Sequence, residues 1–308
     1  MNMKEKNFVS AVIYIRNDES TISDFLTVLY KVFDKNFKKF EIICVDDAST
    51  DNSKKLIKKH VESSNGSMLS IVNMSYYQGL EAAMCAGVDL AIGDFVFEFD
   101  YPVIDFKPEL IIDIYNHAMK GYDIVSCGNG HSRVNSRLFY KIYNRFSGTQ
   151  NKLRSETFRI ISRRAINRVQ SMSVNMPYRK ALYANCGLAC DYVEYEPVSN
   201  SKTFQTLKKP HDTAISSLML FTNIAFGITL TLTVLMMLLM IGTAVYALTI
   251  YLTGNPVEGF TTIILIMSGS FFAVFAILAT VIKYLSLILG LVFFKQKYLI
   301  QSIEKITI

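Results

Sequence analysis

Polar and charged side chains stand directly after three apolar runs of this sequence. Arg16 and Asn17 follow FVSAVIYI, Asp46 and Asp47 end FEIICVDD, and Asp100 ends DFVFEFD. Carboxylates and amides bind divalent cations, and a guanidinium can brace a phosphate with parallel hydrogen bonds. A single Asp in such a position is more often a helix cap or a turn residue. Because carboxylate, amide or guanidinium side chains follow all three runs, a binding site is favoured over three unrelated caps or turns.

The surrounding sequence predicts the elements that bring these residues together. Short, nearly continuous apolar runs are typical of strands buried on both faces, and apolar spacings of three and four are typical of helices. Strands are expected within 8–15, 40–46, 69–74, 94–100 and 122–128, and helices within 18–33, 49–61, 79–91 and 108–119. This alternation predicts an α/β fold with right-handed βαβ units and a mostly parallel sheet. Ligands of such sheets bind beyond the carboxyl ends of the strands.

Charge is unevenly distributed along the 308 residues. The composition is 51% hydrophobic, and no Asp, Glu, Lys or Arg occurs from Thr213 to Val257 or from Gly259 to Ile282. Each of these stretches exceeds the ~20 apolar residues that a membrane-spanning helix needs. The sequence therefore predicts a polar domain over 1–207 and a membrane region over 208–308.

The membrane region is expected to contain two transmembrane helices, at about 224–251 and 260–282, with interfacial helices on either side. The flanking lysines lie on the outer sides of the two spans: Lys208, Lys209, Lys283, Lys295 and Lys297. The positive-inside rule then places both termini and the polar domain on the cytoplasmic face of the membrane. The net charge of +6 is modest, and no segment resembles a nucleic-acid-binding module. The five scattered cysteines are expected to be reduced thiols.

Several motifs resemble, in order and spacing, those of family 2 glycosyltransferases. They are VSAVIYIRNDES, EIICVDDASTDNS, YYQGLEAAMCAGVDLAIGDFVFEFD and GYDIVSCGN. The later FRIISRRAI, YRKALYANCG and SNSKTF, followed by two apolar stretches, resemble the branch that acts on polyprenyl phosphates, which includes bactoprenol glucosyltransferases and dolichol-phosphate mannose synthases. The resemblance implies a GT-A fold and transfer of a hexose, with inversion, from a nucleoside-diphosphate sugar to polyprenyl (undecaprenyl) phosphate.

The resemblance also implies roles for residues at the strand ends. Asp47 would bind the base or ribose of the nucleotide, and Asp46 and Asp51 would shape the loop around it. The positions implied for nucleotide-sugar binding are Arg16, Asn17, Glu19, Asp46, Asp47, Asp51, Gly79 and Glu98. A purely structural alternative for VDDASTD is a strand end followed by the first turn of a helix.

Asp100 matches the first carboxylate of the family's Asp-any-Asp metal motif, but Pro102 occupies the second position and cannot bind a metal. Asp105 is close enough in sequence to supply a second carboxylate from a remodelled loop. Mg²⁺ or Mn²⁺ is therefore expected at Asp100 and Asp105, since Mg²⁺ often needs only one or two protein carboxylates. Arg16, which departs from the family pattern, is a candidate to brace the diphosphate if metal charge is lost.

Arg159 and Lys202 are the candidates to hold the acceptor phosphate, with Asp100 and Arg159 as catalytic residues. Arginines that the family usually carries before the SK pair are absent here. Two alternatives therefore remain: a catalytically weakened relative that serves as a binding or regulatory subunit, and a transferase that acts on a different lipid-linked acceptor. Expected partners are the nucleotide sugar, the lipid bilayer and further copies of the chain, as in the tetramers of the family.

Overall fold

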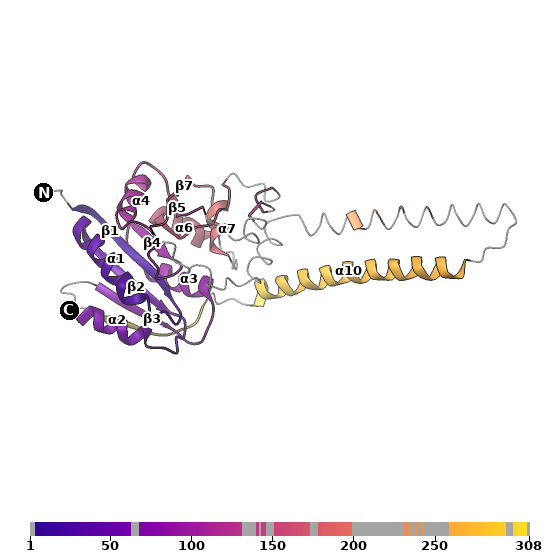
Figure 1. The fold of residues 1–308 in the computed structure, drawn as a ribbon, viewed down its shortest axis with the longest axis horizontal. Helices are drawn as coiled ribbons and strands as arrows, with labels where there is room; N and C mark the ends of the chain where they lie inside the picture. Colours follow the sequence, from indigo (N-terminus) through magenta and orange to yellow (C-terminus); the bar gives the residue numbers. More distant parts are fainter. Residues whose placement is uncertain are drawn as a thin grey trace.

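The computed structural model describes residues 4–62, 68–130, 140–141, 143–145, 151–172, 178–198, 231–232, 235, 238, 242, 259–293 and 298–306. Within them the chain forms one sheet with helices on both faces, from which a long helix extends (Figure 1). Lys202 lies outside the described residues.

The described residues contain eight strands in the order β7-β5-β6-β4-β1-β2-β3-β8. Their bounds are β1 (Glu5–Ile15), β2 (Phe37–Asp46), β3 (Met68–Met74), β4 (Phe95–Phe99), β5 (Ile124–Gly128), β6 (Phe158–Ser162), β7 (Cys190–Glu194) and β8 (Ile300–Ile306). The pairs β1–β2, β1–β4, β2–β3 and β5–β7 are parallel, whereas β4–β6, β5–β6 and β3–β8 are antiparallel. The expected α/β fold with a mostly parallel core is confirmed.

Two layers of helices cover the sheet. The helices are α1 (Ile22–Asn36), α2 (Ser53–Glu62), α3 (Leu80–Leu90), α4 (Leu110–Ala118), α6 (Arg163–Ser171) and α7 (Arg179–Asn185). One core contains the buried side chains of α1 and α4, and the other contains those of α3, α6 and α7. Gly87 lets α3 lie close to the sheet, because a Cβ there would collide with Val12 and Val45. This close packing fixes α3 beside the strand ends.

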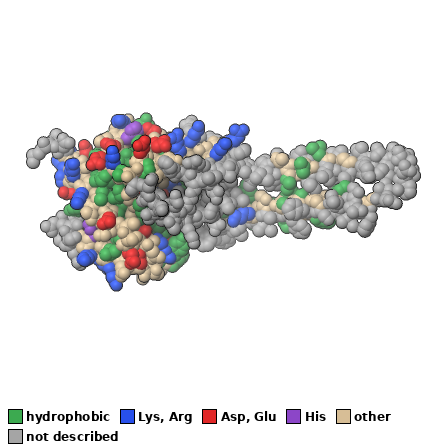
Figure 2. Space-filling model, in the orientation of Figure 1, with side chains coloured by type: hydrophobic (Ala, Val, Ile, Leu, Met, Phe, Trp, Pro, Cys, Tyr) green, Lys and Arg blue, Asp and Glu red, His purple; other side chains and the backbone are tan. Residues whose placement is uncertain are grey.

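The helix α10 (Phe260–Phe293) is 34 residues long and extends away from the sheet (Figure 1). Hydrophobic side chains are visible along this extended part (Figure 2). Over the described residues, no helix meets the combined requirement of length and hydropathy for crossing a membrane. The expected span at 260–282 falls within α10, and the one at 224–251 lies almost wholly outside the described residues. The two-helix hairpin stays a prediction.

The end of the chain differs from the expectation of an amphipathic interfacial segment. Residues 300–306 form strand β8, which pairs antiparallel with β3. Asn73 of β3 donates to Ser302 Oγ over 2.9 Å and to Glu304 Oε1 over 3.0 Å. The expectation of an interfacial segment is therefore wrong for these residues, and the last strand belongs to the sheet of the first domain.

Candidate functional site

The loops that follow β1 and β2 are joined by hydrogen bonds at the carboxyl edge of the sheet. Asn17 Oδ1 accepts from the amide of Thr50 over 2.8 Å, and Glu19 Oε2 accepts from the amide of Asn52 over 3.0 Å. In return, Asp51 Oδ2 accepts from the Glu19 amide over 3.0 Å. The structure thus brings the residues predicted from the two motifs together, and their side chains hold the loops to each other.

The backbone at this edge is unusual. Asn17 and Ala48 adopt positive φ angles of 56° and 54°. Such angles are uncommon for residues other than glycine, and they are least costly for Asn, whose short side chain can bond locally. The hydrogen bonds between the loops hold these conformations in place.

Asp47 is fully buried and anchors the loop that precedes α3. Its Oδ1 accepts from the amide of Gln78 and its Oδ2 from the amide of Gly79, each over 2.8 Å. Oδ2 also accepts from the hydroxyl of Tyr14 over 3.0 Å. Burial, together with the Asp47 charge, raises the pKa of Tyr14 well above its usual range. Asp47 therefore shapes the loop at Gly79, which has a φ of 88°.

Asp46 and Asp51 hold the loop after β2. Asp46 is buried and lies 3.2 Å from Lys54 Nζ of α2. Burial acts to raise the pKa of Asp51, but hydrogen bonds from Ser53 and from the Glu19 amide outweigh it, so the pKa is lowered. Asp46 and Asp51 therefore hold this loop within the protein, and their part in a nucleotide site stays a prediction.

Arg16 has protein partners instead of the open position expected for a diphosphate ligand. Its Nη1 donates to the carbonyl oxygens of Asp47 and Ala48. Its guanidinium carbon lies 4.5 Å from the centre of the Tyr77 ring, which is within range of a cation–π contact. Tyr77 is exposed. This cation–π pair lies beside the carboxyl end of β1.

A buried set of acidic and basic side chains, here called the charge cluster, lies on the sheet face covered by α3 and α7. Its members are Glu81, Glu98, Asp100, Glu156, Arg159, Arg179 and Lys180. Glu98 of β4 is directly opposite Arg159 of β6 in the sheet. Arg159 Nη1 lies 3.1 Å from Glu98, and its Nη2 lies 3.3 Å from Asp100. The two catalytic candidates, Asp100 and Arg159, are therefore in direct contact.

Arg179 links three carboxylates within the charge cluster. Its Nη1 donates to Glu98 over 2.5 Å, its Nη2 to Asp100 over 2.9 Å, and its Nε to Glu81 over 3.0 Å. Glu98 also accepts from the hydroxyl of Tyr183 over 2.5 Å. Glu98 thus has Arg159, Arg179 and Tyr183 as partners within the protein, and its part in nucleotide-sugar binding stays a prediction.

The cations of the charge cluster determine the ionisation of Asp100. Burial alone would raise the pKa of Asp100, but the charges of Arg159, Arg179 and Lys180 outweigh it and hold the pKa far below its usual range. Asp100 is therefore ionised at all physiological pH values. The cluster holds four carboxylates and three cations, which compensate one another almost completely in a buried setting.

The surroundings of Asp100 and Asp105 do not fit the expected Mg²⁺ or Mn²⁺. Each oxygen of Asp100 accepts from a guanidinium group, and a divalent cation there would face three fixed positive charges. Asp105 accepts instead from Tyr195 OH over 2.6 Å and from Asn129 Nδ2 over 3.0 Å. The part of the chain that the structure describes contains no group of three or more His, Cys, Asp or Glu able to hold a metal.

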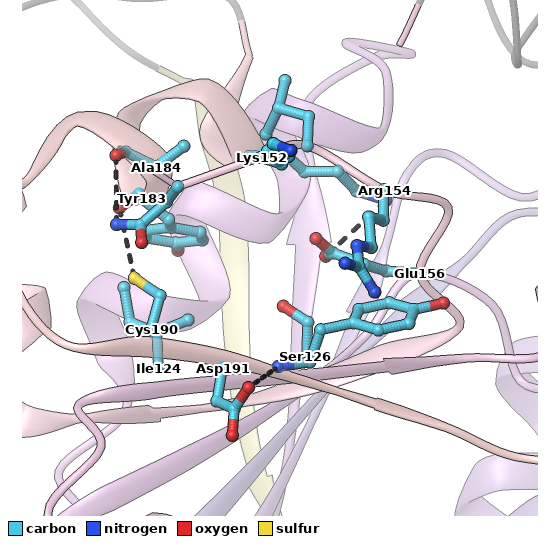
Figure 3. Close-up of a pocket in the computed structure, with 13 residues that line it drawn as sticks. Ile124, Ser126, Lys152, Arg154, Glu156, Tyr183, Ala184, Cys190 and Asp191 are labelled. Atoms are coloured by element: carbon cyan, nitrogen blue, oxygen red, sulfur yellow. Dashed lines mark hydrogen bonds and ion pairs between the residues drawn. The ribbon is translucent and has the colours of Figure 1, made fainter. Parts of the chain in front are cut away.

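A pocket adjoins the charge cluster on the side of β5 and β7. It has a volume of about 270 Å³ and lies between α7, the two strands and residues 151–156. Lys152, Arg154 and Glu156 reach it from the 151–156 segment, and Cys190 and Asp191 reach it from β7 (Figure 3). Lys180 and Glu156 belong both to the pocket and to the charge cluster.

The sequence did not single out Glu81, Glu156, Arg179 or Lys180 as site residues. One signal in the sequence was the pair Arg179–Lys180 within YRKALYANCG, where two adjacent cations begin an otherwise largely apolar helix. Both side chains are buried, at 3% and 5% exposure. Burial of adjacent cations is rare unless carboxylates pair with them, but their partners come from distant parts of the sequence.

A protein-family model, that of glycosyl transferase family 2, matches residues 10–185. The chain belongs to this family. The matched residues include Asp47, Asp100, Arg159 and Arg179, so the carboxyl edge and the whole charge cluster lie in the family region. The expectation of a family 2 glycosyltransferase is confirmed.

Curated relatives of the chain include an uncharacterized glycosyltransferase, sll0501, of Synechocystis, 29% identical over 61% of this chain and 60% of that protein. A further relative is the undecaprenyl-phosphate 4-deoxy-4-formamido-L-arabinose transferase of Aeromonas hydrophila, 34% identical over 41% of this chain and 38% of that protein. The prophage bactoprenol glucosyl transferase homolog of Escherichia coli is 25% identical over 61% and 62%, respectively. The chain spans less than two thirds of the length of these relatives.

Solved structures similar to this chain include a mannosyltransferase from Pyrobaculum calidifontis in complex with GDP-Man and Mn²⁺. It has 14% identity and a TM-score of 0.48, over 95% of this chain and 89% of that one. Another is the glucosyl-3-phosphoglycerate synthase of Mycobacterium tuberculosis with Mn²⁺, UDP and glucosyl-3-phosphoglycerate. It has 14% identity and a TM-score of 0.49, over 69% and 79%, respectively.

Proposed function

We propose that this chain is an inverting glycosyltransferase that moves a hexose from a nucleoside-diphosphate sugar to the phosphate of a polyprenol such as undecaprenyl phosphate. The observation that carries the proposal is the family match over 10–185, which covers the carboxyl edge of the sheet. Relatives named as undecaprenyl-phosphate and bactoprenol transferases support this acceptor class.

The reaction is a single displacement. An oxygen of the acceptor phosphate attacks the anomeric carbon, the bond from that carbon to the diphosphate oxygen breaks, and the nucleoside diphosphate leaves with the electron pair. The acceptor is already an anion at neutral pH, so the protein needs mainly to align the two substrates. The joined loops of Asn17 and Asp51 and the loop anchored by Asp47 would form the wall of the donor site.

We also propose that α10 lies in a membrane, with the sheet domain on the cytoplasmic face. Eight large apolar side chains of α10 are each at least half exposed, at spacings of three and four: Ile263, Met267, Phe271, Val274, Leu278, Val281, Leu285 and Ile288. Apolar surface in water costs roughly 25 cal/mol per Å², so such a stripe favours an apolar environment. A lipid acceptor explains why the enzyme would hold its sheet domain at a membrane surface.

A second candidate function is a catalytically weakened relative that binds substrate without turnover. The specific observation in its favour is the saturation of Asp100 by Arg159 and Arg179. The two candidates differ in one measurable property, which is turnover.

The test is sugar transfer by full-length protein in detergent, with undecaprenyl phosphate and UDP-, GDP- and dTDP-hexoses. We expect a polyprenyl-phosphate sugar with at least one donor. Because guanidinium groups occupy Asp100, we expect product to form in EDTA as well as with Mg²⁺ or Mn²⁺. A donor that binds without any product would instead support the weakened relative.

A further inference from the structure

The pocket beside β5 and β7 has a composition suited to a small anion. Lys152 and Arg154 are exposed at its rim, and Lys180 lies within it. We propose that this pocket binds a phosphate group, with Lys180 as its buried contact and Lys152 and Arg154 at its entrance. The inference rests on the proposed function and names the site for the acceptor phosphate, in place of Arg159 and Lys202.

Lys180 carries the argument because its ammonium group is buried and lies beyond hydrogen-bond distance of its two carboxylate partners. Its side chain is 5% exposed, and its Nζ lies 3.7 Å from Asp100 and 3.8 Å from Glu156. Both distances exceed that of an N–H···O hydrogen bond. Within the part of the chain that the structure describes, these are the carboxylates that pair with it. An anion in the pocket could approach this charged donor more closely than either carboxylate does and accept a charge-assisted hydrogen bond from it.

The charges of Lys180 and its neighbours favour an anion over a cation. Burial acts to lower the pKa of Lys180, but Glu156, Tyr140 and Asp100 outweigh it and the pKa is raised, so the side chain stays charged. Glu156 lies 3.0 Å from Arg159 Nε, and Asp191 lies 2.7 Å from His117 Nε2. The two acids that line the pocket therefore have basic partners of their own.

The rim cations are available to a ligand. Arg154 contacts the face of the Tyr192 ring at 4.9 Å, which orients its guanidinium without neutralising it. Lys152 has no ion pair within the described residues. A guanidinium and two ammonium groups around one cavity can together bind a phosphate dianion.

The size and position of the pocket favour a phosphate group that carries only a few further atoms into the pocket. A volume of about 270 Å³ is below the ~300–1,000 Å³ of sites that enclose drug-sized ligands. A phosphate with its first carbons fits that scale, whereas a complete nucleotide sugar does not. Lys180 contacts Asp100 at the strand end, so a phosphate on Lys180 would lie next to the carboxyl edge where the donor is expected.

The phosphate could come from the acceptor monoester or from the donor diphosphate, and we assign it to the acceptor. The experiment measures binding to full-length protein in detergent by calorimetry, with three probes: inorganic phosphate, citronellyl phosphate, and the nucleoside diphosphates UDP, GDP and dTDP. The variants are the double Lys152→Gln/Arg154→Gln, Lys180→Met, and Arg168→Gln. Arg168 is an exposed cation on α6 outside the pocket and serves as the matched control.

We expect the double variant to bind citronellyl phosphate and inorganic phosphate at least tenfold more weakly and to bind nucleoside diphosphate as the native protein does. Lys180→Met should abolish monoester binding, and a thermal melt checks that it folds. Because the rim residues are exposed, the double variant tests the proposal even if Lys180→Met does not fold.

Unchanged binding of both phosphate probes by the double variant would overturn the proposal. A selective loss of nucleoside diphosphate binding would overturn the assignment to the acceptor. If the native protein binds citronellyl phosphate but no nucleoside diphosphate, the result supports the phosphate site and contradicts the proposed sugar transfer. The experiment therefore distinguishes a failure of the phosphate site from a failure of the proposed function.

Discussion

Arg179 Nη2 donates a 2.9 Å hydrogen bond to Asp100 Oδ1 in the buried charge cluster. Asp100 follows β4, whereas Arg179 begins α7, and neither side chain is more than slightly exposed. A carboxylate at the carboxyl edge of the sheet thus has a guanidinium partner where a metal ion was expected. The same arginine reaches Glu81 and Glu98, so it neutralises much of the acidic charge of the site.

Arg179→Met should destabilise the fold strongly, because it leaves three carboxylates without their shared cation. Removing one partner of a buried ion pair typically costs about 3–5 kcal/mol. Urea unfolding would measure this loss, with Lys120→Met, at an exposed position, as the control that should behave like the native protein. An Arg179→Met protein with the stability of the native protein would show that Arg179 is not needed to stabilise the carboxylates of the charge cluster.

Asp47→Asn should weaken binding of nucleoside diphosphate at least tenfold. The carboxylate accepts from two loop amides and from Tyr14, and hydrogen bonds to a charged group contribute about 1.5–3 kcal/mol each. Calorimetry measures the affinity. Asp94→Asn is the matched control, since Asp94 accepts from the Phe8 amide before β4, away from the carboxyl edge. Equal losses in both variants would argue against a specific role for Asp47.

Asp18 should make stability depend on pH. Burial raises its pKa to about 6, against an unfolded value of about 3.9. The folded state therefore binds more protons in this range, and the contribution of Asp18 to stability is complete below pH ~4 and lost as pH rises through about 6. Asp18→Asn removes this loss while keeping an acceptor for the Arg16 amide.

The free energies of unfolding of Asp18→Asn and native protein should therefore agree near pH ~4 and diverge as pH rises to about 6, with the variant more stable. Above that range the difference should stay constant. Urea titrations at several pH values measure this, and Asp24→Asn on the exposed face of α1 is the control. A constant difference between the variant and the native protein at every pH would contradict the raised pKa.

Gln78→Ala should increase the mobility of two segments. One is strand β8, and the other is the loop at residues 78–79 that Asp47 anchors. The Gln78 side chain donates to the Leu299 carbonyl over 2.7 Å and accepts from the Leu299 amide over 2.8 Å. Loss of this pair should speed amide exchange in β8 and weaken nucleoside diphosphate binding several-fold. Gln170→Ala, which removes an exposed contact with Asp89, is the control. Unchanged amide exchange in β8 would show that its pairing with β3 holds β8 in place without the Gln78 side chain.

Local patterns predicted the elements and the edge of the sheet but not the partners of the buried charges. The run FVFEFD indicated a strand that ends at Asp100, because burial and strand length are local properties. Arg179 follows 79 positions after Asp100, and nothing in the sequence between them specifies that contact. The strand β8 was missed for a similar reason: its isoleucines recur every third residue, which gives no strand period, and its partner β3 is more than 200 residues away.

The most direct test of sugar transfer to a lipid phosphate is the amount of product formed from undecaprenyl phosphate by native protein and by Asp100→Ala, across the donor panel. The account predicts a polyprenyl-phosphate hexose with native protein, in EDTA as well as in Mg²⁺, and none with Asp100→Ala. Nucleotide binding without product from any donor would contradict the proposed activity. Product that forms with Mg²⁺ but not in EDTA would show that a metal ion replaces Arg179 as the partner of Asp100 when the donor binds.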